Sequence, residues 1–390
     1  MKSNIAIYLQ HYLSPSMTFI YRQLLGIRKS FKVFVLSSHK VENLETFPFE
    51  PVYFKSRNFK RFKAGKIFTK IYGQHKLLSR NPRLSFNQKK FFSGIISDKN
   101  IQLIHAHFVP AGIEILPVVK KLNIPLVVNF HGYDGSILLK FRDYREKLKE
   151  LFNEAYILLP SFFMLNELNE RIGTLKNYSV LHIGIPVNEF GFVERKPVQS
   201  KYEKNEKIIF LQVANFVEKK GHFFTVSAFN DFLKYYENAE LILAGDGQLK
   251  DEIQRLVDKL DIINKVKFFG TVTQKQVIEL MGKADVFLHH SVTSNAGDKE
   301  GIPTVLMEAM ATGLPCISTI HAGITELIKD GINGFLVEER DVESYVQKMI
   351  ELVSTSYNFS YEARNTIESD FNLDLQNEKL IKVYNSLMNS

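Results

Sequence analysis

The sequence predicts an α/β protein made of two halves, each a parallel sheet covered by helices. Short apolar runs alternate with longer amphipathic stretches along the chain, which is the pattern of βαβ units. The length of 390 residues exceeds that of most single domains, so two domains are expected. A polar, charged segment at 194–206, with Pro197 inside it, separates the two sets of runs and is predicted to be the linker.

The expected strands are short apolar runs bounded by polar or glycine-containing segments. Those of the first half are 5–9, 32–37, 103–106, 126–130, 156–160 and 179–181. Those of the second half are 207–213, 239–244, 266–269, 286–289, 315–318 and 334–337. Helices are predicted between the strands, among them 221–236, 249–260 and 273–283. The halves repeat an architecture but not a sequence.

The composition is that of a globular protein and excludes several other classes. Apolar residues make up 45% and charged residues 24% of the chain, which does not fit a disordered or collagen-like chain. Cys316 is the single cysteine, so no internal disulfide can form. The apolar run at 5–9 is too short for a signal peptide, and no stretch approaches the ~18 to 20 apolar residues of a membrane span. A cytoplasmic protein is therefore expected.

The excess positive charge lies in one segment, the basic window at 51–97. It holds twelve Lys or Arg, nine aromatic residues and no Asp or Glu. Within it, residues 64–78 have the spacing of a basic amphipathic helix. Such a helix suits either the anionic inner face of the plasma membrane or a core position with its lysines in solvent. Nucleic acid is not expected as a partner, because no nucleic-acid-binding motif accompanies the charge.

The strongest signal of a functional site follows the expected strand at 286–289. A short helix is predicted at 303–312, because Pro303 suits a first helical turn and Gly313 is a stop signal. The main-chain N–H groups at the start of this helix would face a ligand with the positive end of the helix dipole. This is a physical arrangement for binding a diphosphate.

Two glutamates flank the start of this helix. Glu300 lies in the preceding loop, and Glu308 lies more than one turn into the helix. The carboxylate of Glu308 can accept two hydroxyl hydrogen bonds, as a ribose diol offers. Taken alone, these residues could equally be a loop charge and a solvated helix face.

The block 291–337 resembles a known family. Its EGIPTVLMEAMATGLP stretch, at 300–315, resembles the double-glutamate motif of the family-four retaining glycosyltransferases of the GT-B type. The following STIHAGITELI and DGINGFLV stretches are similar to the same family's continuation. Because the order matches across the whole block, the chain is identified as similar to bacterial exopolysaccharide glycosyltransferases of the colanic acid and amylovoran type.

This resemblance implies a GT-B fold, in which two Rossmann-like domains face each other across a cleft. Residues 1–193 would be the acceptor-binding domain and residues 194–372 the nucleotide-sugar-binding domain. The last segment, 373–390, would be a helix that packs back on the N-terminal domain.

The resemblance also implies roles for the block around Glu300. Glu300 would hold hydroxyls of the donor sugar at the catalytic centre, and Glu308 would hold the ribose. The leaving diphosphate would be stabilised by the segment Gly301, Ile302, Pro303 and Thr304, through the main-chain N–H groups that all of these residues except Pro303 carry.

A second segment, LQVANFVEKKGH at 211–222, resembles the family's donor-phosphate loop. Lys220 occupies the position of the family's lysine, and Asn215 stands where the family has an arginine. Outside this context, Lys220 would be an ordinary solvated charge. We expect Lys220 to contact the diphosphate and the side chain of Lys219 to point to solvent.

Three further residues are candidates through the same resemblance. Gly245, in Gly-Asp-Gly, resembles the glycine turn after a family strand, although generic turn chemistry would also explain it. Val272 belongs to the segment whose main chain faces the nucleotide base in the family. His131 follows an expected strand and resembles the acceptor-side histidine that lies near the transferred sugar, although a lone histidine is often structural.

The sequence therefore predicts a glycosyltransferase that moves a hexosyl or N-acetylhexosaminyl group from a UDP- or GDP-sugar, with retention, to a lipid-linked or oligosaccharide acceptor. The product would be a bacterial exopolysaccharide, capsule or lipopolysaccharide. No cofactor or metal site is expected. The basic window 51–97 would hold the protein on the cytoplasmic face of the plasma membrane. The alternatives are a sugar-nucleotide epimerase of the same fold and a catalytically silent sugar-nucleotide-binding protein.

Overall fold

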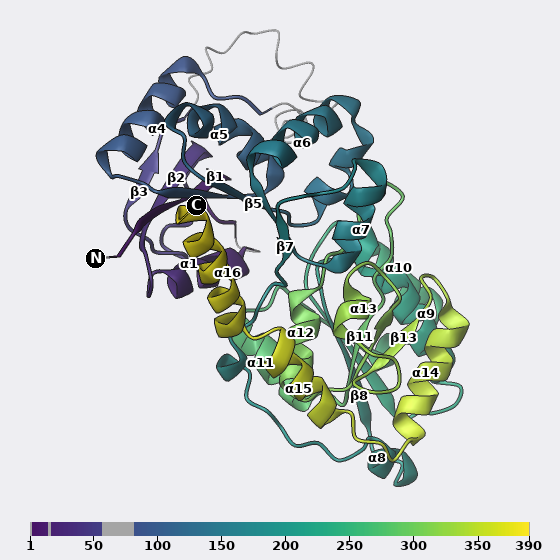
Figure 1. The fold of residues 1–390 in the computed structure, drawn as a ribbon. Helices are drawn as coiled ribbons and strands as arrows, with labels where there is room; N and C mark the ends of the chain where they lie inside the picture. Colours follow the sequence, from purple (N-terminus) through teal and green to yellow (C-terminus); the bar gives the residue numbers. More distant parts are fainter. Residues whose placement is uncertain (1, 15–16, 57–81, 390) are drawn as a thin grey trace. The chain divides into compact units, whose positions relative to one another are not determined.

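The computed structural model describes residues 2–14, 17–56 and 82–389. The described chain forms two compact units, of which the first comprises Met1–His182 with Leu373–Ser390 and the second Ile183–Asn372. Each unit is a parallel sheet with helices packed against it (Figure 1). The predicted fold class, an α/β protein with two Rossmann-like halves, is confirmed.

The sheet of the first unit has seven parallel strands in the order β3-β2-β1-β4-β5-β6-β7. Their bounds are β1 Asn4–His11, β2 Lys32–Lys40, β3 Val52–Phe54, β4 Leu103–His107, β5 Leu126–Asn129, β6 Tyr156–Leu159 and β7 Tyr178–Val180. Six of these match the predicted runs. The edge strand β3 was not predicted, because its three residues are too few to show a period.

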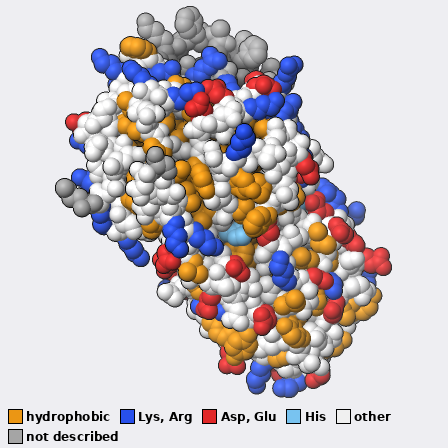
Figure 2. All heavy atoms as spheres, viewed as in Figure 1, with side chains coloured by type: hydrophobic (Ala, Val, Ile, Leu, Met, Phe, Trp, Pro, Cys, Tyr) orange, Lys and Arg blue, Asp and Glu red, His pale blue; other side chains and the backbone are white. Residues whose placement is uncertain are grey.

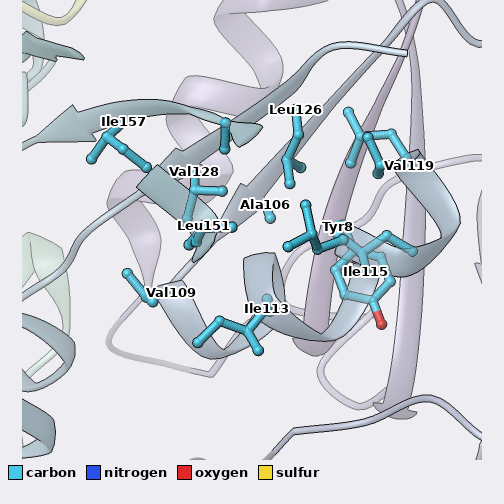
Figure 3. Close-up of a cluster of buried hydrophobic side chains, with 14 of the residues drawn as sticks. Tyr8, Ala106, Val109, Ile113, Ile115, Val119, Leu126, Val128, Leu151 and Ile157 are labelled. Carbon is cyan, nitrogen blue, oxygen red and sulfur yellow. The ribbon is translucent and has the colours of Figure 1, made fainter. Parts of the chain in front are cut away.

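The helices of the first unit form two layers over this sheet. They are α1 Thr18–Ile27, α4 Phe86–Asp98, α5 Val109–Leu122, α6 Arg142–Glu154, α7 Phe162–Arg171 and α16 Leu373–Met388. Figure 3 shows side chains of α5 and α6 converging with those of β1, β4, β5 and β6 in one buried cluster. A second cluster lies under α1 and α16, so the sheet is buried on both faces.

Helix α16 belongs to the first unit although it ends the chain. It packs against α1 and β4 (Figure 1). The hydroxyl of Tyr384 lies 2.5 Å from Nδ1 of His105, and its ring lies edge-on to Phe31 with centroids 5.6 Å apart. Both Tyr384 and Leu380 are fully buried. The final segment therefore completes the core of the first unit.

The sheet of the second unit has six parallel strands in the order β10-β9-β8-β11-β12-β13. Their bounds are β8 Ile208–Val213, β9 Ala239–Ala244, β10 Val266–Gly270, β11 Val286–His289, β12 Cys316–Thr319 and β13 Phe335–Val337. All six match predicted runs. The helices are α8 Gln199–Glu203, α9 His222–Phe232, α10 Lys250–Lys259, α11 Gln274–Lys283, α12 Thr304–Ala311, α13 Ile324–Leu327, α14 Val342–Ser354 and α15 Ser360–Asp370.

The predicted linker at 194–206 is wrong, because this segment packs on the second unit. Arg195 donates from Nη1 to the main-chain oxygen of Ala284 and from Nη2 to that of Met281, both at 2.7 Å. Lys201 forms an ion pair with Asp285 at 2.8 Å. The charged residues that suggested a linker instead make these contacts with the second unit.

The units divide before this segment, at 182/183. Residues following the division are tied to the end of the second unit: the N–H of Ile185 donates to the oxygen of Phe371 at 2.9 Å. Arg364 of α15 donates to the oxygen of Phe190 at 2.7 Å. These hydrogen bonds explain why the unit begins at Ile183 rather than at the expected residue 194.

The predicted amphipathic helix 64–78 of the basic window lies outside the described residues. In the view of Figure 2, Lys and Arg side chains gather along the side of the first unit formed by α4, α5 and α6. The exposed Lys89 and Lys90 of α4 belong to the window, and the neighbouring Phe86 is 80% exposed. Among the described residues, no helix has the length and hydropathy to cross a membrane.

Candidate active site

The predicted donor-site residues of the second unit follow its parallel strands. Because the carboxyl ends of parallel strands meet at one edge of the sheet, the loops after β8, β9, β11, β12 and β13 gather there. The candidate donor site is built from these loops.

The loop between β8 and α9 ends with Lys219 and Lys220. Gly221 follows with φ +60°, and a Cβ there would lie 1.8 Å from the main-chain oxygen of His290. Only glycine therefore lets this loop lie against the loop after β11. Gln212 of β8 donates from Nε2 to the main-chain oxygen of Lys220 at 2.8 Å, which fixes the main chain of this lysine.

Lys220 and Glu300 form an ion pair with Nζ and Oε2 3.0 Å apart. Their side chains are only 16% and 10% exposed. Burial alone would raise the pKa of Glu300, but the ammonium groups of Lys220 and Lys219 outweigh it and lower this pKa to about 2. Glu300 is therefore a carboxylate throughout the physiological range, an acceptor of hydrogen bonds rather than a proton donor.

Lys219 does not point to solvent, so that expectation is wrong. Its Nζ lies 3.1 Å from Oδ2 of Asp298 and 3.4 Å from Oε1 of Glu300. Burial lowers the pKa of Lys219, but these two carboxylates more than compensate and raise it. Two lysines thus neutralise two carboxylates in a closely spaced cluster, whereas the sequence predicted only that Lys220 contacts the diphosphate.

Helix α12 begins beside Glu300 in the chain. Pro303 is its N-cap rather than its first helical residue, with extended ψ of 121°, because the helix itself starts at Thr304. The first main-chain N–H groups of the helix have no acceptor within it, and Gly301 and Ile302 lead directly into this end. Glu308 lies in the middle of α12 and is buried, with 7% exposure.

The remaining donor-site candidates lie on neighbouring loops. Gly245 follows β9 with φ +141°, and a Cβ there would lie 2.0 Å from the main-chain oxygen of Ala214. Its N–H donates to the oxygen of Gly270 at 2.7 Å, which joins the loops after β9 and β10. Val272 packs against the apolar cluster of the second unit. Asn215 is exposed, and no ion pair or hydrogen bond joins its side chain to Lys220.

His131 lies in the first unit, directly after β5, and is described with that unit alone. Its Nε2 lies 3.2 Å from the amide nitrogen of Asn129 and 3.0 Å from Nδ1 of His107. Because an amide N–H can only donate, Nε2 of His131 accepts and the proton of this imidazole resides on Nδ1. Burial, with His107 nearby, holds the pKa of His131 well below its usual range, so the ring is neutral.

Asp134 fixes the main chain around His131. Its Oδ1 accepts from the N–H of His131 at 2.9 Å, and its Oδ2 accepts from the N–H of Val109 at 3.0 Å. Burial raises the pKa of Asp134 to about 6 against the opposing effect of these hydrogen bonds. The loop of His131 is thereby attached to the start of α5.

Glu300, Lys220 and the start of α12 are thus brought together within one unit, whereas the side chains of Asn215 and Val272 make no polar contact with Lys220 or Glu300. Sequence reasoning missed Asp298, His321 and Glu339. His321 bonds to the main chain of Glu300, and Glu339 bonds to His321. His321 lies in the STIHAGITELI stretch, so the resemblance of that stretch to the family could have indicated it.

Among the described residues, no group of three or more His, Cys, Asp or Glu could hold a metal ion.

Solved structures with the same architecture define the class of the fold. HepE of Anabaena, solved with UDP and glucose, superposes with a TM-score of 0.73 at 17% identity, over 98% of this chain and 100% of that one. The galactosyltransferase WaaB of the lipopolysaccharide outer core superposes with a TM-score of 0.68 at 17% identity, over 96% and 98% of the two chains. The fold is GT-B, as the resemblance implied.

Sequence comparisons point to glycosyltransferases as well. Residues 194–368 match the family Glycosyl transferases group 1. The amylovoran biosynthesis glycosyltransferase AmsK of Erwinia amylovora is 27% identical over 346 residues, 86% of this chain and 80% of AmsK. WcaL of Escherichia coli K12, named for colanic acid biosynthesis, is 29% identical over 290 residues, 72% of this chain and 70% of WcaL. The second half of the chain thus resembles group 1 glycosyltransferases, and the chain as a whole is similar to glycosyltransferases named for exopolysaccharide biosynthesis.

Proposed function

We propose that this glycosyltransferase uses a nucleotide sugar as donor and retains the anomeric configuration of the transferred sugar. The proposal rests on one observation above all: Lys220 and Glu300 form a buried ion pair at the carboxyl edge of the second sheet. A diphosphate leaving group requires a cation there, and a sugar requires a hydrogen-bond acceptor. The fold of HepE, which was solved with UDP and glucose, supports the same kind of donor.

Each group in the site has one task in this mechanism. Lys220 and the N–H groups at the start of α12 stabilise the negative charge that develops on the leaving diphosphate. Glu300, ionised at any physiological pH, accepts hydrogen bonds from hydroxyls of the donor sugar. Glu308, which is buried in α12, accepts hydrogen bonds from the ribose. The main chain at Gly245 and Val272 lines the nucleotide.

Retention needs no carboxylate nucleophile in this proposal. Glu300 is held by two lysines at 3.0 and 3.4 Å, and such a tightly paired carboxylate is a poor nucleophile. The acceptor attacks as the diphosphate leaves, and the leaving group itself takes the acceptor's proton. His131 is proposed to orient a sugar hydroxyl through the proton on Nδ1, an atom that has no hydrogen-bond partner among the described residues.

The proposed acceptor is a lipid-linked or oligosaccharide substrate of bacterial surface polysaccharide synthesis. AmsK is named for amylovoran biosynthesis, which supports the polymer class. The basic side chains of α4 and the exposed Phe86 support a place on an anionic membrane surface. The proposed location is accordingly the cytoplasmic face of the plasma membrane.

The donor is tested with the purified protein and a panel of UDP- and GDP-sugars. A donor that binds shifts the melting temperature by mass action. The stabilising donor is then incubated with membrane lipid extract and, as a control, without acceptor. Transfer to an extractable glycolipid, with the anomeric proton coupling of the donor sugar preserved in the product, supports the proposal. Epimerised donor without acceptor, or binding without turnover on any acceptor, would contradict it.

A further inference from the structure

The loop that carries Glu300 has no regular secondary structure. It runs through residues 290–303, between β11 and α12. A carboxylate on such a loop keeps a constant position only when other groups hold the main chain of the loop. The ion pairs with Lys219 and Lys220 hold the side chain, so the main chain must be held elsewhere.

Glu339 holds the first part of this loop. It lies in the turn between β13 and α14, and its Oε2 accepts from the N–H of Thr293 at 2.7 Å. Its Oε1 accepts from the hydroxyl of Thr293 at 3.1 Å. Arg340 pairs with Oε2 of Glu339 at 3.1 Å and also donates to the main-chain oxygen of Thr293. Thr293 is thus bonded through its N–H, hydroxyl and carbonyl.

His321 extends the same network to the last part of the loop. Its Nδ1 lies 2.6 Å from Oε1 of Glu339, and its Nε2 lies 3.0 Å from the main-chain nitrogen of Glu300. A carboxylate accepts only, so the proton of the imidazole is on Nδ1 and Nε2 accepts from the N–H of Glu300. The ring is buried, with 2% exposure, which prevents water from replacing either bond.

We propose that His321 and Glu339 are positioning residues that set the place of Glu300 relative to the donor sugar. This inference rests on the proposed function, in which Glu300 contacts the sugar. One carboxylate, Glu339, is bonded to the loop at Thr293 and, through His321, at Glu300. Glu339 and His321 therefore hold the loop at two points, one on each side of Asp298.

Two substitutions of His321 separate its two hydrogen bonds. His321→Gln can place a carbonyl oxygen near the position of Nε2, where it accepts from the N–H of Glu300. His321→Asn can place an amide N–H near the position of Nδ1, where it reaches Glu339 but leaves Glu300 unbonded. We expect His321→Asn to lower kcat by about tenfold to a hundredfold, as the loss of one buried hydrogen bond does, and His321→Gln to recover most of it.

The affinity for free nucleoside diphosphate distinguishes positioning from a general structural effect. Lys220 and Glu308 bind the nucleotide part in the proposed function, whereas the hydrogen bonds of His321 run to Glu300 and Glu339. The dissociation constant of the nucleoside diphosphate should therefore stay within about twofold of wild type in His321→Asn, below the effect of one lost hydrogen bond. His182→Asn, in the first unit, is the matched control and should leave both kcat and this affinity unchanged.

The pH profile supplies a second readout. The titratable and charged groups around His321 are Glu339, Glu300, Lys299 and His289. Burial lowers the pKa of His321 against the opposing effect of Glu339. Protonation would turn Nε2 of His321 from an acceptor into a donor that faces the N–H of Glu300. We therefore expect kcat to fall on the acid side as pH drops through the pKa of His321. His321→Gln should lack that acid limb.

Amide hydrogen exchange of the loop tests the inference without donor or activity. Peptides covering 296–303 should exchange faster in His321→Asn than in wild type or His321→Gln. Unchanged exchange in His321→Asn, or equal kcat for the Asn and Gln variants, would overturn the inference. A wild-type protein that transfers no sugar would instead contradict the proposed function, and the exchange measurement would still decide whether His321 holds the loop.

Discussion

Lys220 and Glu300 are held with Nζ and Oε2 3.0 Å apart, although one residue follows β8 and the other precedes α12. The cation proposed to bind the phosphate and the carboxylate proposed to bind the sugar thus hold each other in position before any nucleotide sugar binds. An ammonium group has three donors, so Lys220 can keep Glu300 and still bond a phosphate oxygen. Preorganised charge of this kind lowers the cost of rearrangement during the reaction.

The first prediction concerns Lys220. Removing a single preorganised donor from a developing oxyanion costs about 2.7 to 4 kcal/mol of transition-state stabilisation. Lys220→Ala should therefore lower kcat by about two to three decades in a donor-turnover assay. Wild-type turnover in this variant would show that the phosphate loop has been assigned to the wrong residues.

The neighbouring lysine is the matched control for that experiment. Lys219→Ala removes an ion pair with Asp298 and a longer contact with Glu300, but leaves Lys220 in place. A partly exposed pair contributes about 0 to 1 kcal/mol, so we expect a decrease of about fivefold or less. A loss equal to that of Lys220→Ala would assign the phosphate contact to both lysines.

The second prediction separates the two glutamates. Glu308→Ala should weaken binding of the free nucleoside diphosphate by about one to two decades, since a hydrogen bond to a charged group contributes about 1.5 to 3 kcal/mol. Glu300→Ala should leave this affinity nearly unchanged and lower turnover. Isothermal titration with the nucleoside diphosphate decides between them, and equal affinity in both variants and wild type would contradict the assignment.

The third prediction is a pH dependence of stability. The pKa of Glu300 is lowered from 4.5 to about 2 in the folded protein. A lowered pKa stabilises the fold above the unfolded value, and this contribution is lost as pH falls from about 5 towards 2. Its size is about 3 kcal/mol as an upper bound. The difference in free energy of unfolding in urea between wild type and Glu300→Gln should shrink over that range. A difference that stays constant would contradict the predicted stabilisation by the ionised Glu300.

The fourth prediction concerns the basic window. Wild-type protein should float with liposomes that contain acidic lipid, and binding should fall as salt rises, because the screening length is ~8 Å at physiological ionic strength. Replacing Lys89 and Lys90 with Glu should weaken flotation, since each surface lysine contributes about 1 kcal/mol at an anionic bilayer. Lys348→Glu, in the second unit, is the control. Flotation that depends on neither salt concentration nor lipid charge would favour the alternative, in which the helix of the basic window packs in the core with its lysines in solvent.

The fold could be predicted from the sequence because its strands are buried on both faces. The centres of these strands, such as 241–244 and 286–288, are continuously apolar, so the strand type is visible without tertiary information. The segment at 194–206 was misassigned because its charges suggest solvent. Arg195 and Lys201 in fact satisfy main-chain oxygens and Asp285, and such partners cannot be found from composition.

Motif spacing singled out Glu300 and Lys220, which the fold joins in one ion pair, and their roles stay a prediction. The residues that support them were not singled out. Lys219 lies beside Lys220 in the sequence, and nothing in its type indicates that it turns towards Asp298. Glu339 follows another strand altogether, and its link to Glu300 through His321 depends on the order of β11, β12 and β13 in the sheet. Only the folded chain brings these three loops together.

The placement of α16 in the first unit makes that unit discontinuous in the sequence. The second unit, Ile183–Asn372, is one uninterrupted stretch, whereas the core around His105 needs Tyr384, near the end of the chain. On the ribosome, the second unit can therefore reach its final fold while the first still lacks its closing helix. Domains usually fold in the order in which they are synthesised; in this chain, the part that is made first is finished last.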